Sequence, residues 1–323
     1  MALTLSRLGF GAAPIAGLYT AVDPDTAAAT VDAAWDAGVR YFDTAPHYGL
    51  GVSERRLGVA LAGRDRDAYA VSTKAGRLLV PSGGGGLDDE GGFAVPATHR
   101  RVWDLSRDGI RRSLDESLVR LGLDRVDLLY LHDPEDRLDE ALATALPALA
   151  ELRDEGVVAA VGAGSKDGAA LTRLVREGGL DVVMVAGRYT LLEQPALTGL
   201  FPACAAAGTS VVAAGVFNSG LLASPEPDPG STYDYGAVPP AVLARARELA
   251  AVCAEHGAVL PQAALQFPLR HPLVRSAVVG MRSPAEVERN AALLGDPVDP
   301  ELWAALEGRG LIPAGAASAA PAP

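Results

Sequence analysis

Short apolar runs rich in β-forming residues recur along the chain and alternate with longer stretches of helical periodicity. The apolar runs are continuous rather than alternating, which is typical of strands buried on both faces of a parallel sheet. They are YFDTA (41–45), YAVSTK (69–74), VDLLYLH (126–132), VVAAVGAG (157–164), DVVMVAGRY (181–189), SVVAAGVF (210–217) and SAVVGM (276–281). With a further strand near LGFGAAP at the start, the pattern predicts eight strand and helix units, the count of an α/β fold of the (β/α)8 or TIM barrel class.

Glycines mark the ends of several predicted helices. The stretches DPDTAAATVDAAWDAG, DLSRDGIRRSLDESLVRLG and LDEALATALPALAELRDEG end in Gly38, Gly122 and Gly156. A glycine after the last helical residue is typical of a C-cap, because glycine adopts the left-handed backbone conformation without steric cost. We expect one barrel domain over residues 1–314, followed by a flexible Ala/Pro tail over residues 315–323 (GAASAAPAP).

Two connections are too long to be plain turns. One runs from Gly76 to about Trp103 through SGGGG, after the third strand, and the other from about Asn218 to Val238 through SPEPDPGSTYDYG, after the seventh. In a barrel both would lie over the C-terminal mouth, where long loops commonly cover a ligand. For the glycine run itself, a disordered insertion is an equally good interpretation.

Composition and charge favour work on small molecules. The net charge is −12, which disfavours nonspecific attachment to nucleic acid or to an anionic membrane. The two cysteines, Cys204 and Cys253, can build neither a disulfide framework nor a cysteine-based metal site. The start MALTLSRLGFG lacks a secretory signal pattern, and no long apolar run is present. We expect a cytoplasmic protein with no nucleic-acid or membrane partner, and a monomer by default.

Three consecutive predicted strands end in an ionisable residue, namely Asp43, Lys74 and His132. One such ending means little, because a lone aspartate is often a turn former and a lone histidine is often a core residue. A buried lysine is different, since its charge is costly to bury without a partner. Lys74 therefore predicts a nearby carboxylate, and Asp43, one strand away, is the best placed in the sequence.

Tyr48 gains a purpose beside this pair. A phenol with a pKa near 10 exchanges protons poorly at neutral pH unless its anion is stabilised, and an adjacent ammonium does that. His132 could orient a substrate oxygen or relay its proton. This set suits proton exchange at a carbonyl or carbinol oxygen and contains no nucleophilic Ser or Cys triad and no metal cluster. A barrel aldolase that uses Lys74 as a Schiff-base lysine remains an alternative.

The stretches FDTAPHYG, VSTK and LLYLH, in this order on these strands, resemble the aldo-keto reductase family over nearly the whole chain. The resemblance implies that Asp43, Tyr48, Lys74 and His132 form a catalytic tetrad. It also implies that Tyr48 acts as general acid/base while a nicotinamide cofactor exchanges hydride with the substrate carbon.

Further stretches, among them DVVMVAGRYTLLEQPAL and GVFNSGLLA, resemble a branch of that family, the L-fucose or D-threo-aldose 1-dehydrogenases, with pyridoxal 4-dehydrogenases as relatives. The resemblance implies oxidation of the hemiacetal C1 of an aldose of the L-fucose, D-arabinose or L-galactose type to a lactone. Two other readings stay open: a reductase of a pyridoxal-like or secondary-metabolite carbonyl, and a redox sensor that binds the cofactor with negligible turnover.

No GxGxxG follows the first strand, so a Rossmann dinucleotide site is excluded, and phosphates in a barrel are usually held after strands 7 and 8. NADP-preferring members of the family commonly carry a Lys and an Arg where this chain has Gly280 and Glu286, so NAD is the preferred cofactor and NADP the second. Ser283 is equally explained as a helix N-cap. The expected cofactor contacts are Ser165, Phe217, Asn218, Ser219, Gly220, Leu221, Gly280, Arg282, Ser283, Glu286 and Asn290.

Candidate substrate contacts follow from their position near the mouth. Four residues follow strands or lie in mouth loops: Tyr19, His47, Trp103 and Arg188. Trp103 would stack on a sugar ring, with His47 as a polar partner. The family often has an Asn against the nicotinamide carboxamide where this chain has Lys166, so the sequence departs from the family pattern at this position.

Overall fold

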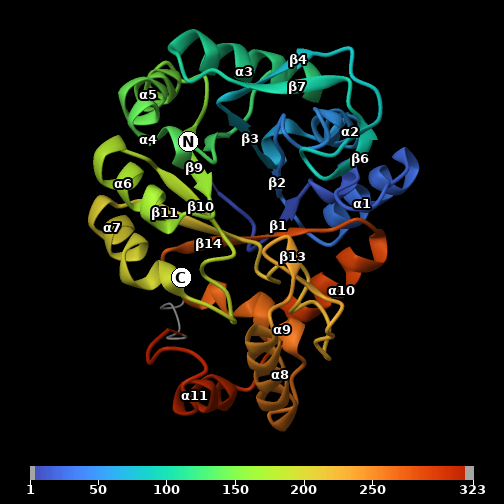
Figure 1. Cartoon of the computed structure of the whole chain (residues 1–323), viewed down its shortest axis with the longest axis vertical. Coiled ribbons are helices and arrows are strands. Elements are labelled where there is room, and N and C mark those ends of the chain that lie inside the picture. Colours follow the sequence, from blue (N-terminus) through green and yellow to red (C-terminus); the bar gives the residue numbers. More distant parts are fainter. Residues whose placement is uncertain (1–3, 317–323) are drawn as a thin grey trace.

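The computed structural model describes residues 4–316 and shows a closed barrel of eight parallel strands at the centre (Figure 1). Each strand pairs with the next along the chain, and the last pairs with the first, with Leu8 opposite Ala277. The predicted (β/α)8 class is confirmed. The barrel strands are β1 (Leu8–Gly11), β2 (Tyr41–Asp43), β3 (Ala70–Ala75), β8 (Leu128–His132), β9 (Ala160–Ser165), β10 (Val182–Ala186), β11 (Ser210–Ala214) and β14 (Val274–Gly280).

Helices surround the barrel, and an apolar layer fills the space between them and the strands. Gly122 is a left-handed C-cap as predicted, whereas Gly38 and Gly156 follow the cap by one residue, also with positive φ. The helix predicted to end at Gly156 is interrupted by a π-helical stretch, Ala141–Ala145. The helices are α1 (Pro24–Asp36), α2 (Val52–Leu61), α3 (Arg107–Leu121), α4 (Leu138–Glu140), α5 (Leu146–Asp154), α6 (Gly168–Gly178), α7 (Leu200–Ala207), α8 (Pro240–Glu255), α9 (Leu260–Gln266), α10 (Pro284–Gly295) and α11 (Pro300–Gly308).

The long connection after β3 is a folded insertion. Its strands β4 (Arg77–Pro81) and β7 (His99–Trp103) pair antiparallel, and β5 (Leu87–Asp88) pairs with β6 (Phe93–Pro96). The sequence pattern did not indicate these strands. The glycine run itself, for which a disordered insertion was the other interpretation, covers residues 82–86, carries no strand and links β4 to β5. The connection after β11 carries the short pair β12 (Thr232–Tyr233) and β13 (Gly236–Ala237).

The predicted tail begins with residues that contact the barrel domain. Ala316 is buried, and its carbonyl oxygen accepts a hydrogen bond from Tyr189 Oη at 3.1 Å. The rest of the predicted tail, residues 317–323, lies outside the described residues. Among the described residues, no helix combines the length and apolar character needed to cross a membrane.

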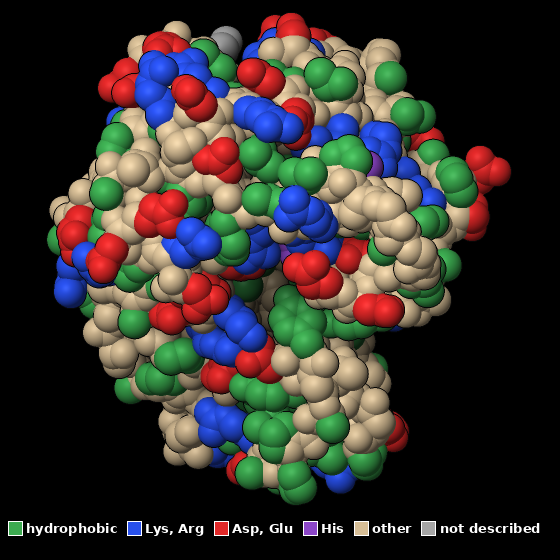
Figure 2. Space-filling model, turned by 45° about the horizontal axis from the view of Figure 1, so that its top comes forward, with side chains coloured by type: hydrophobic (Ala, Val, Ile, Leu, Met, Phe, Trp, Pro, Cys, Tyr) green, Lys and Arg blue, Asp and Glu red, His purple; other side chains and the backbone are tan. Residues whose placement is uncertain are grey.

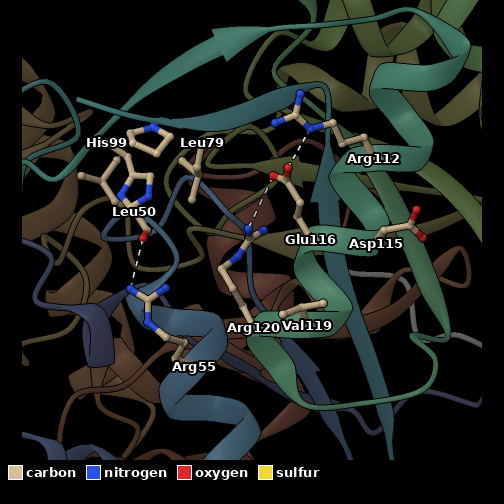
Figure 3. Close-up of a pocket in the computed structure, with 10 residues that line it drawn as sticks. Leu50, Arg55, Leu79, His99, Arg112, Asp115, Glu116, Val119 and Arg120 are labelled. Carbon is tan, nitrogen blue, oxygen red and sulfur yellow. Dashed lines mark hydrogen bonds and ion pairs between the residues drawn. The ribbon is translucent and has the colours of Figure 1, made fainter.

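A buried carboxylate joins α2, β3 and α3 on the outside of the barrel. Glu54 in α2 is fully buried and accepts hydrogen bonds from Thr73 Oγ1 at 2.8 Å and from Arg120 Nε. Arg120 lines an external cavity of about 480 Å³, where Arg112 pairs with Glu116 near the surface (Figure 3).

Arg120→Met should lower the free energy of unfolding by about 3–5 kcal/mol, because it leaves the Glu54 carboxylate buried without its cation. The matched control is Arg112→Met in the same helix, which removes an exposed ion pair and should cost less than about 1 kcal/mol. Urea unfolding of both variants measures the difference. Equal losses would show that Glu54 does not depend on Arg120.

Candidate active site

Three neighbouring barrel strands carry an ionisable side chain inside the barrel, at the last strand residue in β2 and β8 and at the last but one in β3. Side chains alternate between the two faces of a strand. In β8, Tyr130 belongs to the apolar cluster inside the barrel, whereas Leu129 belongs to the layer beneath the helices. The same alternation places the strand-terminal side chains on the interior face, where they are 2%, 3% and 7% exposed for Asp43, Lys74 and His132.

Lys74 is paired as the sequence predicted. Its Nζ donates to Asp43 Oδ2 at 2.7 Å and to the Thr44 carbonyl oxygen at 2.9 Å. The other carboxylate oxygen, Asp43 Oδ1, accepts from Ser72 Oγ at 2.7 Å, and Ser72 contacts Tyr41 Oη at 3.0 Å. Burial works against the Lys74 ammonium, but Asp43 and Tyr48 outweigh burial and raise its pKa above the usual value.

Tyr48 lies on the segment that follows β2. Its ring centroid is 4.5 Å from Lys74 Nζ. The chain turns at once: Gly49, Leu50 and Gly51 all have positive φ, and a Cβ on Gly49 would lie 2.9 Å from the Ala16 backbone oxygen, so only glycine fits. Burial raises the pKa of Tyr48 to about 12, although the Lys74 ammonium acts to lower it.

Two imidazoles complete the cluster. The ring of His132 lies 5.8 Å from that of Tyr48 and 5.4 Å from that of His47. Burial, and then the Lys74 ammonium, lower the pKa of His132 well below its usual value. Burial and the guanidinium of Arg101 lower the pKa of His47 to about 3. Both rings are therefore neutral at physiological pH and can donate or accept hydrogen bonds.

These groups line a cavity of about 390 Å³ at the C-terminal mouth of the barrel. The face in Figure 2 is hollowed near its centre, with acidic and basic side chains mixed around the hollow. Of the residues expected at the site, seven line the cavity: Asp43, His47, Tyr48, Lys74, His132, Ser165 and Gly280. Sequence reasoning missed others that also line it, among them Leu18, Gly91, Phe93, Asp133, Glu135 and Met184.

The missed residues differ in the signal that they carried. Met184 could have been found, because strand alternation places it inside the barrel. Asp133 simply follows His132. Gly91 and Phe93 lie in the insertion, where no periodicity pointed to the mouth.

The residues predicted after β11 surround a turn beside the cavity. Asn218 and Ser219 have positive φ, as does Gly220, and the first two line a small adjoining cavity with Lys166 and Tyr235. Asn218 Nδ2 donates to Glu193 Oε1 at 3.3 Å, while Asn218 Oδ1 is buried with no partner in the described structure. The Leu221 side chain is fully buried and Phe217 packs against the same core, so these two could offer only backbone groups or a ring edge.

The segment after β14 begins α10. Ser283 is its N-cap, with Oγ accepting from the Glu286 backbone N–H, which is the capping role anticipated as one interpretation. The Glu286 carboxylate accepts from the Arg282 backbone N–H at 2.9 Å and lies 3.4 Å from Arg282 Nε. Asn290 is 2% exposed, and its Oδ1 has no partner among the described residues.

Charged residues after β9 and β10 contact the loop that follows β11. Lys166 Nζ lies 3.4 Å from Asp234 Oδ1, and Arg188 Nη2 donates to Asp234 Oδ2 at 2.9 Å. Arg188 also pairs with Glu193 at 3.1 Å. Ser165 Oγ donates to Glu135 Oε2 at 2.9 Å. Arg188 therefore lies outside the main cavity and is occupied by two carboxylates.

Two predicted substrate contacts lie elsewhere than expected. Trp103 is not among the residues that line the cavity; its ring packs against the Arg77 guanidinium, 4.5 Å away. Tyr19 is 50% exposed and lies 6.5 Å from the ring of Tyr235. Phe93 provides the aromatic surface next to Tyr48 instead, with its ring 6.1 Å away.

An acid and lysine pair, a phenol and a neutral imidazole at the mouth of a (β/α)8 barrel define an enzyme that can exchange a proton with a substrate oxygen. The profile of the Aldo/keto reductase family matches residues 7–309. The chain belongs to this family of oxidoreductases, which use nicotinamide cofactors.

Two relatives match this chain over almost its full length. The chain is 54% identical to D-threo-aldose 1-dehydrogenase of Pseudomonas sp over 315 residues, 96% of either chain. It is 38% identical to pyridoxal 4-dehydrogenase of Microbacterium luteolum over 96% of this chain and 95% of that protein. The holo form of an aldo-keto reductase from Bacillus halodurans superimposes with a TM-score of 0.74 at 26% identity, covering 98% of this chain and 95% of that one.

Neutral buried imidazoles should make the fold sensitive to mild acid. His47 and His132 resist protonation in the folded protein, but each gains a proton near pH 6.5 in the unfolded chain. Their contribution to the free energy of unfolding is therefore complete above pH 6.5 and is lost as the pH falls toward the pKa values of the folded protein. Each should lower the free energy of unfolding by about 1.4 kcal/mol per pH unit below pH 6. His47→Gln should reduce that slope by one such increment in urea unfolding from pH 6 to 5. An unchanged slope would contradict the neutral state of His47.

Proposed function

We propose that the protein is an NAD-dependent dehydrogenase that oxidises the hemiacetal C1 of an aldose to a lactone. The observation that carries the proposal is the buried Lys74 and Asp43 pair, which lies 4.5 Å from the Tyr48 ring on the wall of the mouth cavity. The 54% identity to D-threo-aldose 1-dehydrogenase supports a sugar as the substrate class.

The proposed roles follow from the geometry. Tyr48 as phenolate takes the proton of the C1 hydroxyl, and Lys74 stabilises that phenolate while Asp43 fixes the ammonium. His132 is neutral and donates a hydrogen bond to the same substrate oxygen. When bound, the oxidised nicotinamide supplies the acceptor for the hydride that leaves C1. The substrate thus loses one proton and one hydride, and the C1 carbonyl of the lactone forms.

The residues after β11 and β14 fit a dinucleotide. Asn218 Oδ1 and Asn290 Oδ1 are buried amide oxygens without a partner among the described residues, which is costly unless a ligand donates to them. We assign the cofactor contacts to these two residues, to Ser219 and to Gly280. Glu286 pairs with Arg282, the cation best placed in this segment to bind a 2′-phosphate, which supports NAD over NADP.

Glu286→Gln tests the cofactor preference. The wild type should have a higher kcat/KM with NAD than with NADP, and the variant should shift the ratio toward NADP by about tenfold because Arg282 is freed and a negative charge is removed. Glu288→Gln, an exposed acid on the same helix, is the matched control and should leave the ratio unchanged. A wild type that prefers NADP would overturn the NAD assignment.

A second function is favoured by the protonation state of Tyr48. A phenol with a pKa of about 12 is protonated at neutral pH, which suits a general acid that reduces a carbonyl. The 38% identity to pyridoxal 4-dehydrogenase suggests a pyridoxal-like aldehyde as a probe. The Schiff-base alternative loses support, because the raised pKa of Lys74 keeps the amine protonated.

Absorbance of reduced nicotinamide tests the proposal with L-fucose, D-arabinose and L-galactose. Oxidation needs the deprotonated form of Tyr48. As long as the pH stays below the pKa of this phenol, kcat/KM should therefore rise about tenfold per pH unit in the alkaline range. Tyr48→Phe should lower kcat by at least about a hundredfold and leave NAD affinity unchanged. With reduced nicotinamide supplied instead, cofactor consumption by pyridoxal in the absence of any sugar oxidation would favour the reductase. Bound cofactor without turnover in either direction would favour the sensor.

A further inference from the structure

The insertion after β3 reaches back to the start of the barrel and to the mouth. Phe93 forms an antiparallel bridge with Leu18, Ala94 N–H donates to the Gly17 carbonyl oxygen at 2.9 Å, and Tyr19 N–H donates to the Gly92 carbonyl oxygen at 3.1 Å. The β5 and β6 pair is thus fixed to the loop that follows β1. This contact brings Phe93 to the cavity wall, where it is only 4% exposed.

A buried ion pair fastens the insertion to the segment after β2 that carries His47 and Tyr48, residues 47–51, called the catalytic segment below. Arg101 of β7 donates to both carboxylate oxygens of Asp88, at 2.7 and 2.6 Å, and the two side chains are 4% and 3% exposed. Arg101 Nη2 also donates to the His47 carbonyl oxygen at 2.8 Å, one residue before Tyr48. Asp88 Oδ1 accepts from the Gly91 backbone N–H at 3.2 Å, so one pair joins β7, the β5 and β6 turn, and the catalytic segment.

Gly91 shows how closely this junction is packed. A Cβ at this position would lie 2.3 Å from Arg101 Nη2 and 2.7 Å from Asp88 Oδ2, so a larger residue would displace the pair. The other end of the catalytic segment is held from outside the barrel, where Arg55 Nη2 donates to the Leu50 carbonyl oxygen at 3.3 Å (Figure 3). The insertion therefore holds the His47 end of the catalytic segment, the end that faces the mouth cavity.

We propose that this insertion is the substrate-selecting wall of the site. In this arrangement Phe93 contacts the substrate, and Arg101, held by Asp88, is the positioning residue that fixes the wall against the catalytic segment through the His47 carbonyl. The inference rests on the proposed function. Phe93 is the aromatic neighbour of both Tyr48 and His47, with ring centroids 6.1 and 6.2 Å away.

The chemistry of this wall predicts what it recognises. An aromatic ring offers an apolar surface to the C–H groups of a sugar. The ring of a phenylalanine makes no conventional hydrogen bond with the hydroxyl groups of the sugar. L-fucose carries a methyl group on C5, whereas D-arabinose has none. The wall should therefore contribute to discrimination between these two sugars.

Phe93→Ala tests the wall directly. We expect KM for L-fucose to rise about tenfold while kcat stays within about twofold, and the ratio of kcat/KM for L-fucose over D-arabinose to fall by about tenfold, the effect of one methyl group in an apolar pocket. NAD affinity, measured by quenching of protein fluorescence, should stay unchanged because the proposed cofactor residues follow β11 and β14. A folded Phe93→Ala with an unchanged ratio would overturn the assignment of Phe93.

Arg101→Lys tests the positioning role, because a lysine cannot make the two-pronged contact with Asp88 and also reach the His47 carbonyl. The same sugar ratio should fall, and hydrogen exchange at the Tyr19 and Ala94 amides should accelerate at least tenfold while β8 and β9 stay protected. The matched control is Arg100→Lys, an exposed neighbour on the same strand, which should match the wild type in both measurements.

The two measurements separate the possible failures. Accelerated exchange in Arg101→Lys together with an unchanged sugar ratio would overturn the selecting role and leave a structural one. Unchanged exchange would overturn the positioning role whatever the enzyme oxidises. A wild type without sugar oxidation would contradict the proposed function, and the exchange result would still decide whether Arg101 fixes the wall.

Discussion

The buried contact between Lys74 and Asp43 is the interaction on which the site depends. An ammonium inside a barrel loses its hydration, and only a close carboxylate with further hydrogen bonds compensates for that loss. Both requirements are met, because the Thr44 carbonyl accepts from Lys74 and Ser72 holds the second oxygen of Asp43. Further down the barrel, the interior cluster consists of apolar and phenolic side chains such as Tyr41, Tyr130 and Val212, so the ionisable pair lies in the last interior layer before the mouth. Whatever Tyr48 does as an acid or a base, it does beside this fixed charge.

A second constraint acts on the backbone that carries the phenol. Tyr48 belongs to a segment with three successive left-handed residues, and such a turn keeps its shape only if its carbonyl groups are held. Backbone hydrogen bonds close the turn, from Tyr48 N–H to the Ala45 carbonyl and from Gly51 N–H to the Pro46 carbonyl, and Arg101 and Arg55 add contacts at the His47 and Leu50 carbonyls. Strand alternation therefore positions the ammonium and the imidazole, whereas the phenol is positioned by the hydrogen bonds of its own turn together with side chains from the insertion and from α2.

The sequence predicted what depends on local pattern. Continuous apolar runs specified the barrel strands, and the ionisable residue at the end of three of these runs led to Asp43, Lys74 and His132. It predicted a long connection over the mouth after the third strand but not the strands within it, which are short, nor the contact between Asp88 and Arg101, two residues that no periodicity connects. For the same reason Trp103 was expected at the mouth, where the structure has Phe93. The pairing of β4 with β7 places Trp103 beside Arg77, and the bridge between Phe93 and Leu18 brings Phe93 to the cavity; neither contact is visible in the sequence.

The direction of the chemistry is not decided by the proton-transfer residues. Burial raises the pKa of Tyr48 and the Lys74 ammonium lowers it, and because burial is the larger effect the proton stays on the phenol at neutral pH. The same residue is then an acid toward a carbonyl at neutral pH and a base toward a hydroxyl at higher pH. Oxidation and reduction consequently share one set of side chains. What can separate a sugar dehydrogenase from a carbonyl reductase on this framework is the wall that receives the substrate, which is where a chain can change without disturbing the buried charge.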